Sequence, residues 1–178
     1  MADTGWVIAG AGADAGGGDD GPWSLPGRVT ADDGSETSVN IGSSGDWSSY
    51  LRASTFGLSV PAGATIDGIE TRIQARQNSG GADYLEVKLM YNGVQQGVKL
   101  PGVAIAGSAT NYDYGGASDL WGGTWAAGSG NDVNNNLFAF QIQVEATGTT
   151  INTYVDAMWV KVYYTEAASG GNLIWPIT

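Results

Sequence analysis

The feature that most constrains the fold is a stretch of alternation within residues 56–76, FGLSVPAGATIDGIETRIQAR. From Ile69 to Ala75 every second residue is Ile, Thr, Ile or Ala, and the residues between and after them are Glu, Arg, Gln and Arg. Because strand side chains alternate with period two, this pattern predicts a long strand with one buried and one wet face. Residues 56–60 are predicted as a short strand, and residues 61–64 as a turn in which Pro61 withholds an N–H. The stretch predicts β architecture and assigns no chemistry.

The composition favours an all-β protein. No stretch carries a sustained apolar stripe with the helical period of about 3.6 residues. Val, Ile, Tyr and Trp gather in the alternating segments, while 29 glycines, with Ser, Thr, Asn and Asp, mark the turns. The 178 residues are enough for one domain with its own core.

Charge and missing residue types exclude several functions. The formal charge is −11, from seven basic and 18 acidic residues, so we expect neither nucleic-acid nor membrane-surface binding. The chain has no Cys and no His, which rules out disulfides, thiolate zinc sites and triads that use His. We therefore predict no metal site and no cofactor. No secretory signal or membrane span is visible, so we expect synthesis in a host cytoplasm.

Further segments of strand character complete the predicted architecture. They are residues 37–41, 49–54, 84–91, 94–100, 137–146 and 152–165. Asn92-Gly93 is the strongest short hairpin signal, and residues 78–83 form a second hairpin connection. About eight strands joined by turns predict an antiparallel two-sheet β-sandwich of jelly-roll type with extended N- and C-terminal arms. A closed barrel is the competing architecture.

The sequence divides into three parts. Residues 1–22 form a Gly/Asp-rich N-terminal arm, residues 23–165 the sandwich, and residues 166–178 a C-terminal linker with an apolar tip. The glycine density of GAGADAGGGDDG predicts an arm or long loop, since such a stretch does not hold a strand on its own.

Each arm contains a short apolar run. The tip would bury roughly a few hundred Å² of apolar surface, so it either folds back on its own sheet or docks on a neighbour. We predict that the two runs dock on partners. Their residues are Trp6, Val7 and Ile8 in the first, and Leu173, Ile174, Trp175 and Ile177 in the second.

A loop rich in aromatic residues is the best local candidate for a ligand site. Residues 101–136 lack strand periodicity but contain Tyr112, Tyr114, Trp121 and Trp125 among Gly, Ser and Asp. Aromatic faces beside carboxylates bind sugars in many β-sandwich modules. The alternative is that the tryptophans plug one end of the sandwich, because large aromatic side chains dominate core burial.

The acidic residues favour no catalytic site. Glycoside hydrolysis needs two carboxylates at a defined separation, and Asp113, Asp119, Asp132 and Glu145 are the candidates. Acids in Gly-rich loops are commonly solvated turn residues, so we predict no enzyme. Asp19 and Asp20 lie among glycines without the spacing of a calcium loop.

Four segments in a fixed order resemble a known family. They are PWSLPGRVTADDGS, FGLSVPAGATIDGIETRIQAR, GGASDLWGGTW followed by Asp132-Val133-Asn134, and YVDAMWVKVYYT. Together they cover most of residues 22–165, and they resemble β-sandwich domains of tailed-phage virion proteins and prophage-encoded proteins. The resemblance implies a structural role in a phage particle and no catalytic signature.

We therefore expect a non-enzymatic virion structural protein. The first hypothesis is a capsid decoration or cement subunit, attached through its arms to the major capsid protein or other virion proteins. A homo-oligomer is expected, with a trimer as one option. The alternative is a carbohydrate- or receptor-binding module of a phage tail fibre or tail tip.

Overall fold

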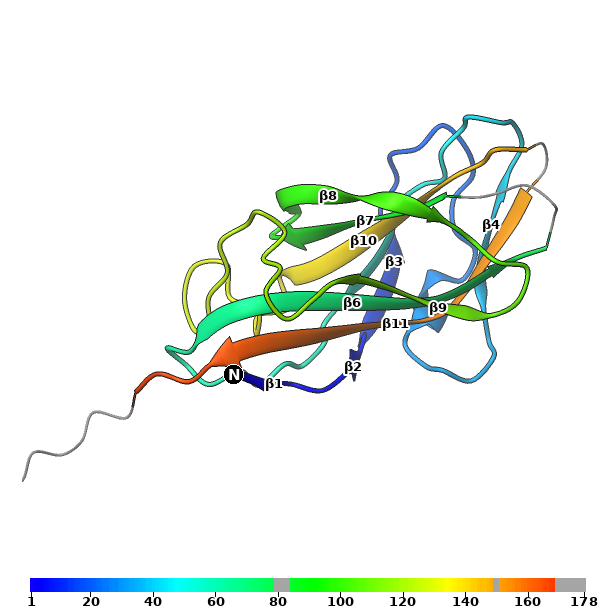
Figure 1. Ribbon diagram of the computed structural model, residues 1–178. Coiled ribbons are helices and arrows are strands. Elements are labelled where there is room, and N and C mark those ends of the chain that lie inside the picture. Colours follow the sequence, from blue (N-terminus) through cyan, green and yellow to red (C-terminus); the bar gives the residue numbers. More distant parts are fainter. Residues whose placement is uncertain (79–83, 149–150, 169–178) are drawn as a thin grey trace, which may run out of the picture.

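The structure, a computed structural model, describes residues 1–78, 84–148 and 151–168. In these residues its regular secondary structure is almost entirely strand, arranged as two facing antiparallel sheets (Figure 1). The elements are β1 (Ala2–Asp3), β2 (Val7–Ile8), β3 (Ala11–Asp14), the 3₁₀ turn η1 (Pro26–Val29), β4 (Thr37–Ile41), β5 (Leu51–Ser54), β6 (Thr65–Gln77), β7 (Tyr84–Tyr91), β8 (Val94–Ala104), β9 (Thr110–Gly115), β10 (Phe138–Glu145) and β11 (Ile151–Thr165).

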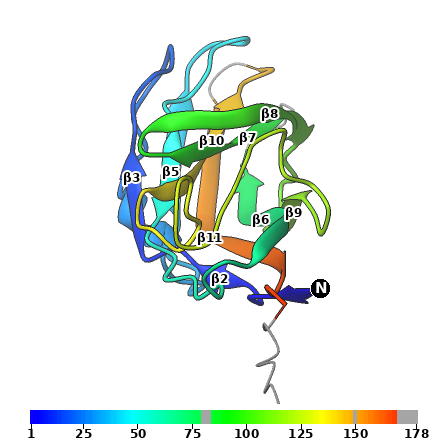
Figure 2. The same ribbon diagram turned by 90° about the vertical axis from the view of Figure 1, so that its left-hand side faces the viewer.

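The two sheets are named here after their central strands. In the β11 sheet the order is β1-β11-β6-β9, and β2 and β4 also pair with β11. In the β10 sheet the order is β3-β5-β10-β7-β8. The chain changes sheet at most connections after β4, so both sheets enclose one core (Figure 2). The predicted all-β, antiparallel two-sheet sandwich is confirmed. No helix among the described residues is long and apolar enough to cross a membrane.

The alternation predicted for residues 69–76 is confirmed in β6. Ile69 and Ile73 are fully buried, while Glu70 and Arg72 between them are only partly buried. β6 pairs with β11 along its length, from Thr65 opposite Thr165 to Gln77 opposite Thr153. β10 buries Phe138, Phe140, Ile142 and Val144 against this pair, as its own alternation predicts.

Residues 56–60 differ from the prediction of a short strand. They form no ladder, because the left-handed φ angles of Thr55 (59°) and Gly57 (65°) interrupt the extended backbone. Phe56, Leu58 and Val60 are buried all the same. The side chain of Asn134 replaces a strand neighbour by accepting from the N–H of Val60 at 2.8 Å and donating to its C=O at 2.8 Å.

The Gly-rich N-terminal segment also differs from the prediction, because residues 11–14 are a strand. β3 pairs with β5, so the neighbour supplies the ladder that a Gly-rich stretch does not sustain alone. At Gly12 a Cβ atom would lie 2.1 Å from the C=O oxygen of Pro26, so only glycine fits there. β1 and β2 pair with β11 at the edge opposite β6.

The predicted loop over residues 101–136 contains strand at its start. β8 continues to Ala104, and β9 adds an edge strand to β6. The Asn92-Gly93 hairpin between β7 and β8 is confirmed, with left-handed φ angles of 49° and 76°. Most of the other predicted hairpin connection, residues 79–83, lies outside the described residues.

Candidate functional site

The aromatic loop residues lie mostly inside the protein. Tyr114, Trp121 and Trp125 are 6%, 1% and 7% exposed. The indole N–H of Trp121 donates to the C=O of Ile69 at 2.9 Å, and that of Trp125 donates to the C=O of Leu120 at 3.1 Å. The burial of these three side chains agrees with the plug alternative.

Tyr112 and Tyr114 are fixed by hydrogen bonds as well. The hydroxyl of Tyr114 donates to the C=O of Leu85, and burial raises the pKa of Tyr114 well above its ordinary value. Tyr112 packs partly buried against the core, and its hydroxyl accepts from the N–H of Ala106 at 2.6 Å. The four residues therefore tie β9 and the following loop to the body of the sandwich.

The candidate carboxylates are dispersed over the molecule. Asp113 forms an ion pair with Arg72 on the β11 sheet, and Glu145 lies on β10 in the other sheet. Asp119 accepts from the N–H of Trp121 at 2.7 Å, and Asp132 accepts from that of Asn134 at 3.0 Å. The last two are turn residues, and no pair among the four shares a site. No group of three or more potential metal ligands occurs among the described residues.

Of the two predicted docking segments, one is visible. Val7 and Ile8 form β2, with Val7 packed against the core. The Trp6 ring lies 4.2 Å from the Arg72 guanidinium and 4.5 Å from the Lys161 ammonium group, so the arm covers its own sheet. Leu173, Ile174, Trp175 and Ile177 lie outside the described residues. Docking on a partner stays a prediction for both segments.

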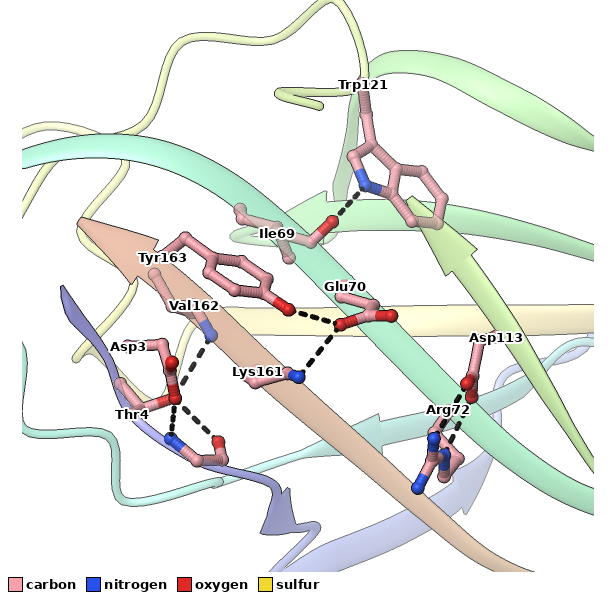
Figure 3. A network of polar contacts seen from close by, with 11 residues as sticks. Asp3, Thr4, Ile69, Glu70, Arg72, Asp113, Trp121, Lys161, Val162 and Tyr163 are labelled. Carbon is pink, nitrogen blue, oxygen red and sulfur yellow. Dashed lines mark hydrogen bonds and ion pairs between the residues drawn. The ribbon is translucent and has the colours of Figure 1, made fainter. Parts of the chain in front are cut away.

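On the outer face of the β11 sheet, four charged residues pair with one another (Figure 3). Arg72 makes a bidentate pair with Asp113, with both N···O distances 2.7 Å. Glu70 accepts from the Tyr163 hydroxyl at 2.7 Å and pairs with Lys161 at 3.1 Å. Such paired groups leave little hydrogen-bonding capacity for a ligand.

The outer face of the β10 sheet is different, because it is hollowed. Gln141 and Gln143 alternate with the core residues of β10 and point away from the core, yet they are only 7% and 6% exposed. A polar side chain on an outer face is shielded in this way only where walls stand beside it.

Two loops build the wall beside β3 and β5, and they lie side by side in both views (Figures 1 and 2). Residues 15–20 bond to residues 47–50 through backbone pairs that include the N–H of Tyr50 to the C=O of Gly16 at 2.9 Å. At Gly18 a Cβ would lie 2.1 Å from the C=O oxygen of Ser48, so glycine permits this approach. Gln143 braces the wall, donating to the C=O of Gly17 and of Ser48 at 3.1 and 2.8 Å.

Two half-buried aromatic residues, Trp47 and Tyr50, come from this wall. Each ring faces a lysine from the opposite side: Lys88 on β7 lies 3.3 Å from the Tyr50 centroid, and Lys99 on β8 lies 5.2 Å from the Trp47 ring. Since β10 separates β5 from β7, these contacts cross above β10. They define a groove along β10, here called the β10 groove.

Two open hollows follow one another in the β10 groove. One of about 390 Å³ is lined by residues that include Arg52, Ser54, Met90 and Gln141. The other, of about 480 Å³, is lined by Gly17, Gly18, Asp19, Trp47, Lys99 and Gln143. The groove thus offers aromatic surface, amide groups and cations along one strand.

Sequence reasoning did not identify the β10 groove. Its residues come from segments far apart in the chain, some of them strands with an ordinary polar face and others, such as residues 15–20, glycine-rich loops. The usable signal was the outward face of β10, where Gln141 and Gln143 stand in place of charged residues.

Comparisons with known proteins assign no family. No family model matches the chain, and no curated protein is significantly similar to it. Among solved structures, a CBM4 structure aligns with a TM-score of 0.47 and 12% identity, covering 88% of this chain and 93% of that one. The TmCBM61 structure in complex with β-1,4-galactotriose aligns with a TM-score of 0.44 and 9% identity, covering 88% of each.

A phage protein is also similar in structure. The enzymatically active domain of tailspike protein 4 from bacteriophage CBA120 aligns with a TM-score of 0.41 and 8% identity, covering 90% of this chain and 19% of that one. Likenesses of this degree assign neither a ligand nor a biological role, so those follow only from the residues of the β10 groove.

Proposed function

We propose that this protein is a non-enzymatic carbohydrate-binding module that holds a glycan chain in the β10 groove. The observation that supports it most is the shielded, polar floor of the groove beside the two wall aromatics. Gln141 is buried although it lies on an outer face, and its side chain makes no hydrogen bond to any described residue. Its amide is therefore available to a ligand.

The groove has the chemistry that a glycan requires. Sugar hydroxyls need donors and acceptors, which Gln141, Gln143 and Ser54 in the hollows supply. Sugar C–H faces pack on aromatic rings, here Trp47 in one hollow and Tyr50 beneath Lys88. Two hollows in line along β10 suit consecutive units of a chain better than one compact small molecule.

The carboxylates near the groove do not favour catalysis. Glu86 forms an ion pair with Lys99, which leaves it unsuited to act as a free general acid. Asp19 lies in the wall of one hollow and Glu145 lies beside Trp47 at the end of β10. These three carboxylates therefore favour glycan binding without hydrolysis.

The biological setting stays a prediction. A receptor-binding module of a phage tail fibre agrees with a glycan groove, whereas a capsid decoration subunit would depend on terminal arms that dock on a lattice. The N-terminal arm covers its own β11 sheet, and the apolar tip lies outside the described residues. The groove therefore supports the glycan-binding alternative without deciding between virion sites.

The test is binding of the purified chain to a panel of immobilised polysaccharides. We expect saturable binding to at least one polymer, lost in Gln141→Ala with Trp47→Ala and retained in Asn111→Ala, an exposed β9 residue of the other sheet. Binding that survives the double substitution would overturn the assignment to the groove. Binding to no polymer, with saturable binding to purified capsids, would favour the decoration role.

A further inference from the structure

The basic residues of this acidic chain are divided between the two outer faces. On the side of the β11 sheet, Arg72, Arg76 and Lys161 pair with Asp113, Glu36 and Glu70, and Arg28 donates to the C=O of Glu36 at 2.9 Å. The remaining three, Arg52, Lys88 and Lys99, lie on the β10 sheet. Of these, only Lys99 has a carboxylate partner among the residues that the structure describes, and it is Glu86.

Arg52 has no acceptor among the described residues. Its Nε is buried without a hydrogen bond, and its side chain forms no ion pair, although the chain contains 18 acidic residues. A buried guanidinium N–H without an acceptor is costly, so it marks a place where an acceptor from outside is favoured. Arg52 lines the hollow that Gln141 also lines.

Lys88 is the second cation without an acceptor. It forms no hydrogen bond or ion pair to the described residues and rests on the Tyr50 ring instead. Burial, with the like charge of Lys99, lowers the pKa of Lys88, and the charge of Glu86 opposes this shift. An anion between the two free cations would stabilise both.

The sheet holds these groups in one row. Gln141 is directly opposite Arg52 on β5 and directly opposite Lys88 on β7. Neighbouring strands lie about 4.8 Å apart, so the two cations start about 10 Å apart, on either side of an amide that makes no other bond. A planar carboxylate can accept two N–H bonds from a guanidinium, and the mobile ammonium group can reach it from the other side.

We propose that the β10 groove selects glycans that carry a carboxylate, that is uronic-acid residues, and that Arg52 and Lys88 bind this carboxylate. The inference rests on the proposed function and names its ligand class. When Lys88 turns to the carboxylate, it leaves the face of Tyr50 free for the neighbouring sugar ring.

The overall charge limits how densely the ligand can be charged. With a net charge of −11 the protein repels a polyanion. At physiological salt the screening length is about 8 Å, so a carboxylate inside the groove is affected mainly by the nearby charges of Arg52 and Lys88. Asp19 and Glu145 at the borders of the groove add to this repulsion. The ligand is therefore a chain with uronic acids spaced by neutral sugars.

The experiment compares polymers that differ only in their carboxylates. Glucuronoxylan and hyaluronan, in which neutral sugars separate the uronic acids, are tested before and after chemical reduction of the carboxyl groups, with polygalacturonate and dextran sulfate as densely charged controls. The variants are Arg52→Gln and Lys88→Gln, and Arg28→Gln is the matched control on the side of the other sheet. The readout is affinity by isothermal titration or affinity electrophoresis.

We expect binding to a spaced uronic-acid polymer that weakens about tenfold or more on carboxyl reduction and in Arg52→Gln, and that Arg28→Gln leaves unchanged. Equal binding before and after reduction, or binding to neutral polymers alone, would overturn this inference and keep the proposed function. Stronger binding to dextran sulfate would overturn the choice of carboxylate. Binding to no polymer would overturn both proposals.

Discussion

The ammonium group of Lys88 lies 3.3 Å from the ring centroid of Tyr50, so one contact crosses above β10. Lys88 belongs to β7, and Tyr50 directly precedes β5 at the wall. Along the chain, Tyr50 lies between Trp47, which lines one hollow, and Arg52, which lines the other. A glycan that spans both hollows must either displace the contact between Lys88 and Tyr50 or pack against it.

Tyr50→Ala should therefore weaken glycan binding by about fivefold or more while the protein stays folded, since an aromatic packing face contributes about 1 kcal/mol beyond its buried area. Titration with the best polymer of the panel measures the change. Tyr154→Ala is a matched control, because Tyr154 is also half-buried beneath a cation, Arg76, but lies on the β11 sheet. Equal losses in both variants would point to a general effect on folding and not to the groove.

Substitutions of Trp121 should lower the stability of the protein and leave glycan binding unchanged. Trp121→Phe removes the indole donor to the C=O of Ile69, which keeps its second bond from the N–H of Gly116, so the cost should be about 0.5–1.5 kcal/mol in the free energy of unfolding. Trp121→Ala should cost about 3–5 kcal/mol. Denaturant unfolding measures both. A loss of glycan binding with unchanged stability would favour the aromatic loop as a sugar platform over the plug.

Asp156 should make stability depend on pH. Burial and the charges of Asp32 and Asp33 raise the pKa of Asp156, against the hydrogen bond from Gly34, and one of its carboxylate oxygens has no partner among the described residues. The native state thus keeps this proton to higher pH than the unfolded chain, whose pKa is near the ordinary 3.8. Protonated Asp156 therefore stabilises the native state fully below the unfolded pKa, and this stabilisation is lost as the pH rises through the higher pKa of the folded state.

Asp156→Asn removes this titration. The variant should gain free energy of unfolding relative to the wild type at neutral pH, and the difference should shrink as pH falls toward 4. Urea unfolding across this range gives the comparison, with Asp113→Asn on the exposed Arg72 pair as the control. A difference that grows toward low pH would contradict the sign argued here.

The N-terminal arm should behave as part of the fold. Deleting residues 1–8 removes β1, β2 and the Trp6 ring, and exposes part of the edge of β11. Free strand edges pair with other chains, so the truncated protein should be less stable and should self-associate. Sedimentation and thermal unfolding test this. A monomer of unchanged stability would show that the segment is dispensable to the sandwich and free to dock elsewhere.

Local patterns in the sequence predicted the long strands well. β4, β6, β10 and β11 each have strict alternation or a clear apolar run, and Asn92-Gly93 specified its turn. β3 and β9 were missed for a common reason. The first is glycine-rich and the second is mostly exposed, so each depends on a distant partner, β5 or β6, for its hydrogen bonds.

The β10 groove was unpredictable for the same reason. Arg52, Gln141 and Lys88 meet only because register sets them opposite one another across three strands. The aromatic loop, by contrast, was visible in the sequence, and the choice between a plug and a platform depended on burial. Trp121 at 1% exposure shows why composition alone did not decide it.

The pairing of β1 with the last residues of β11 has a mechanical consequence. Ala2 lies opposite Tyr164, so the two ends of the described fold leave from the same place (Figure 1). A force applied between these two ends would break the hydrogen bonds of β1 and then of β2 with β11 one after another. Sequential breaking needs little force, and it would come before β6 or the opposite sheet carried any load. Under tension about the first ten residues would become extended, and the β10 groove would stay folded and keep its bound glycan.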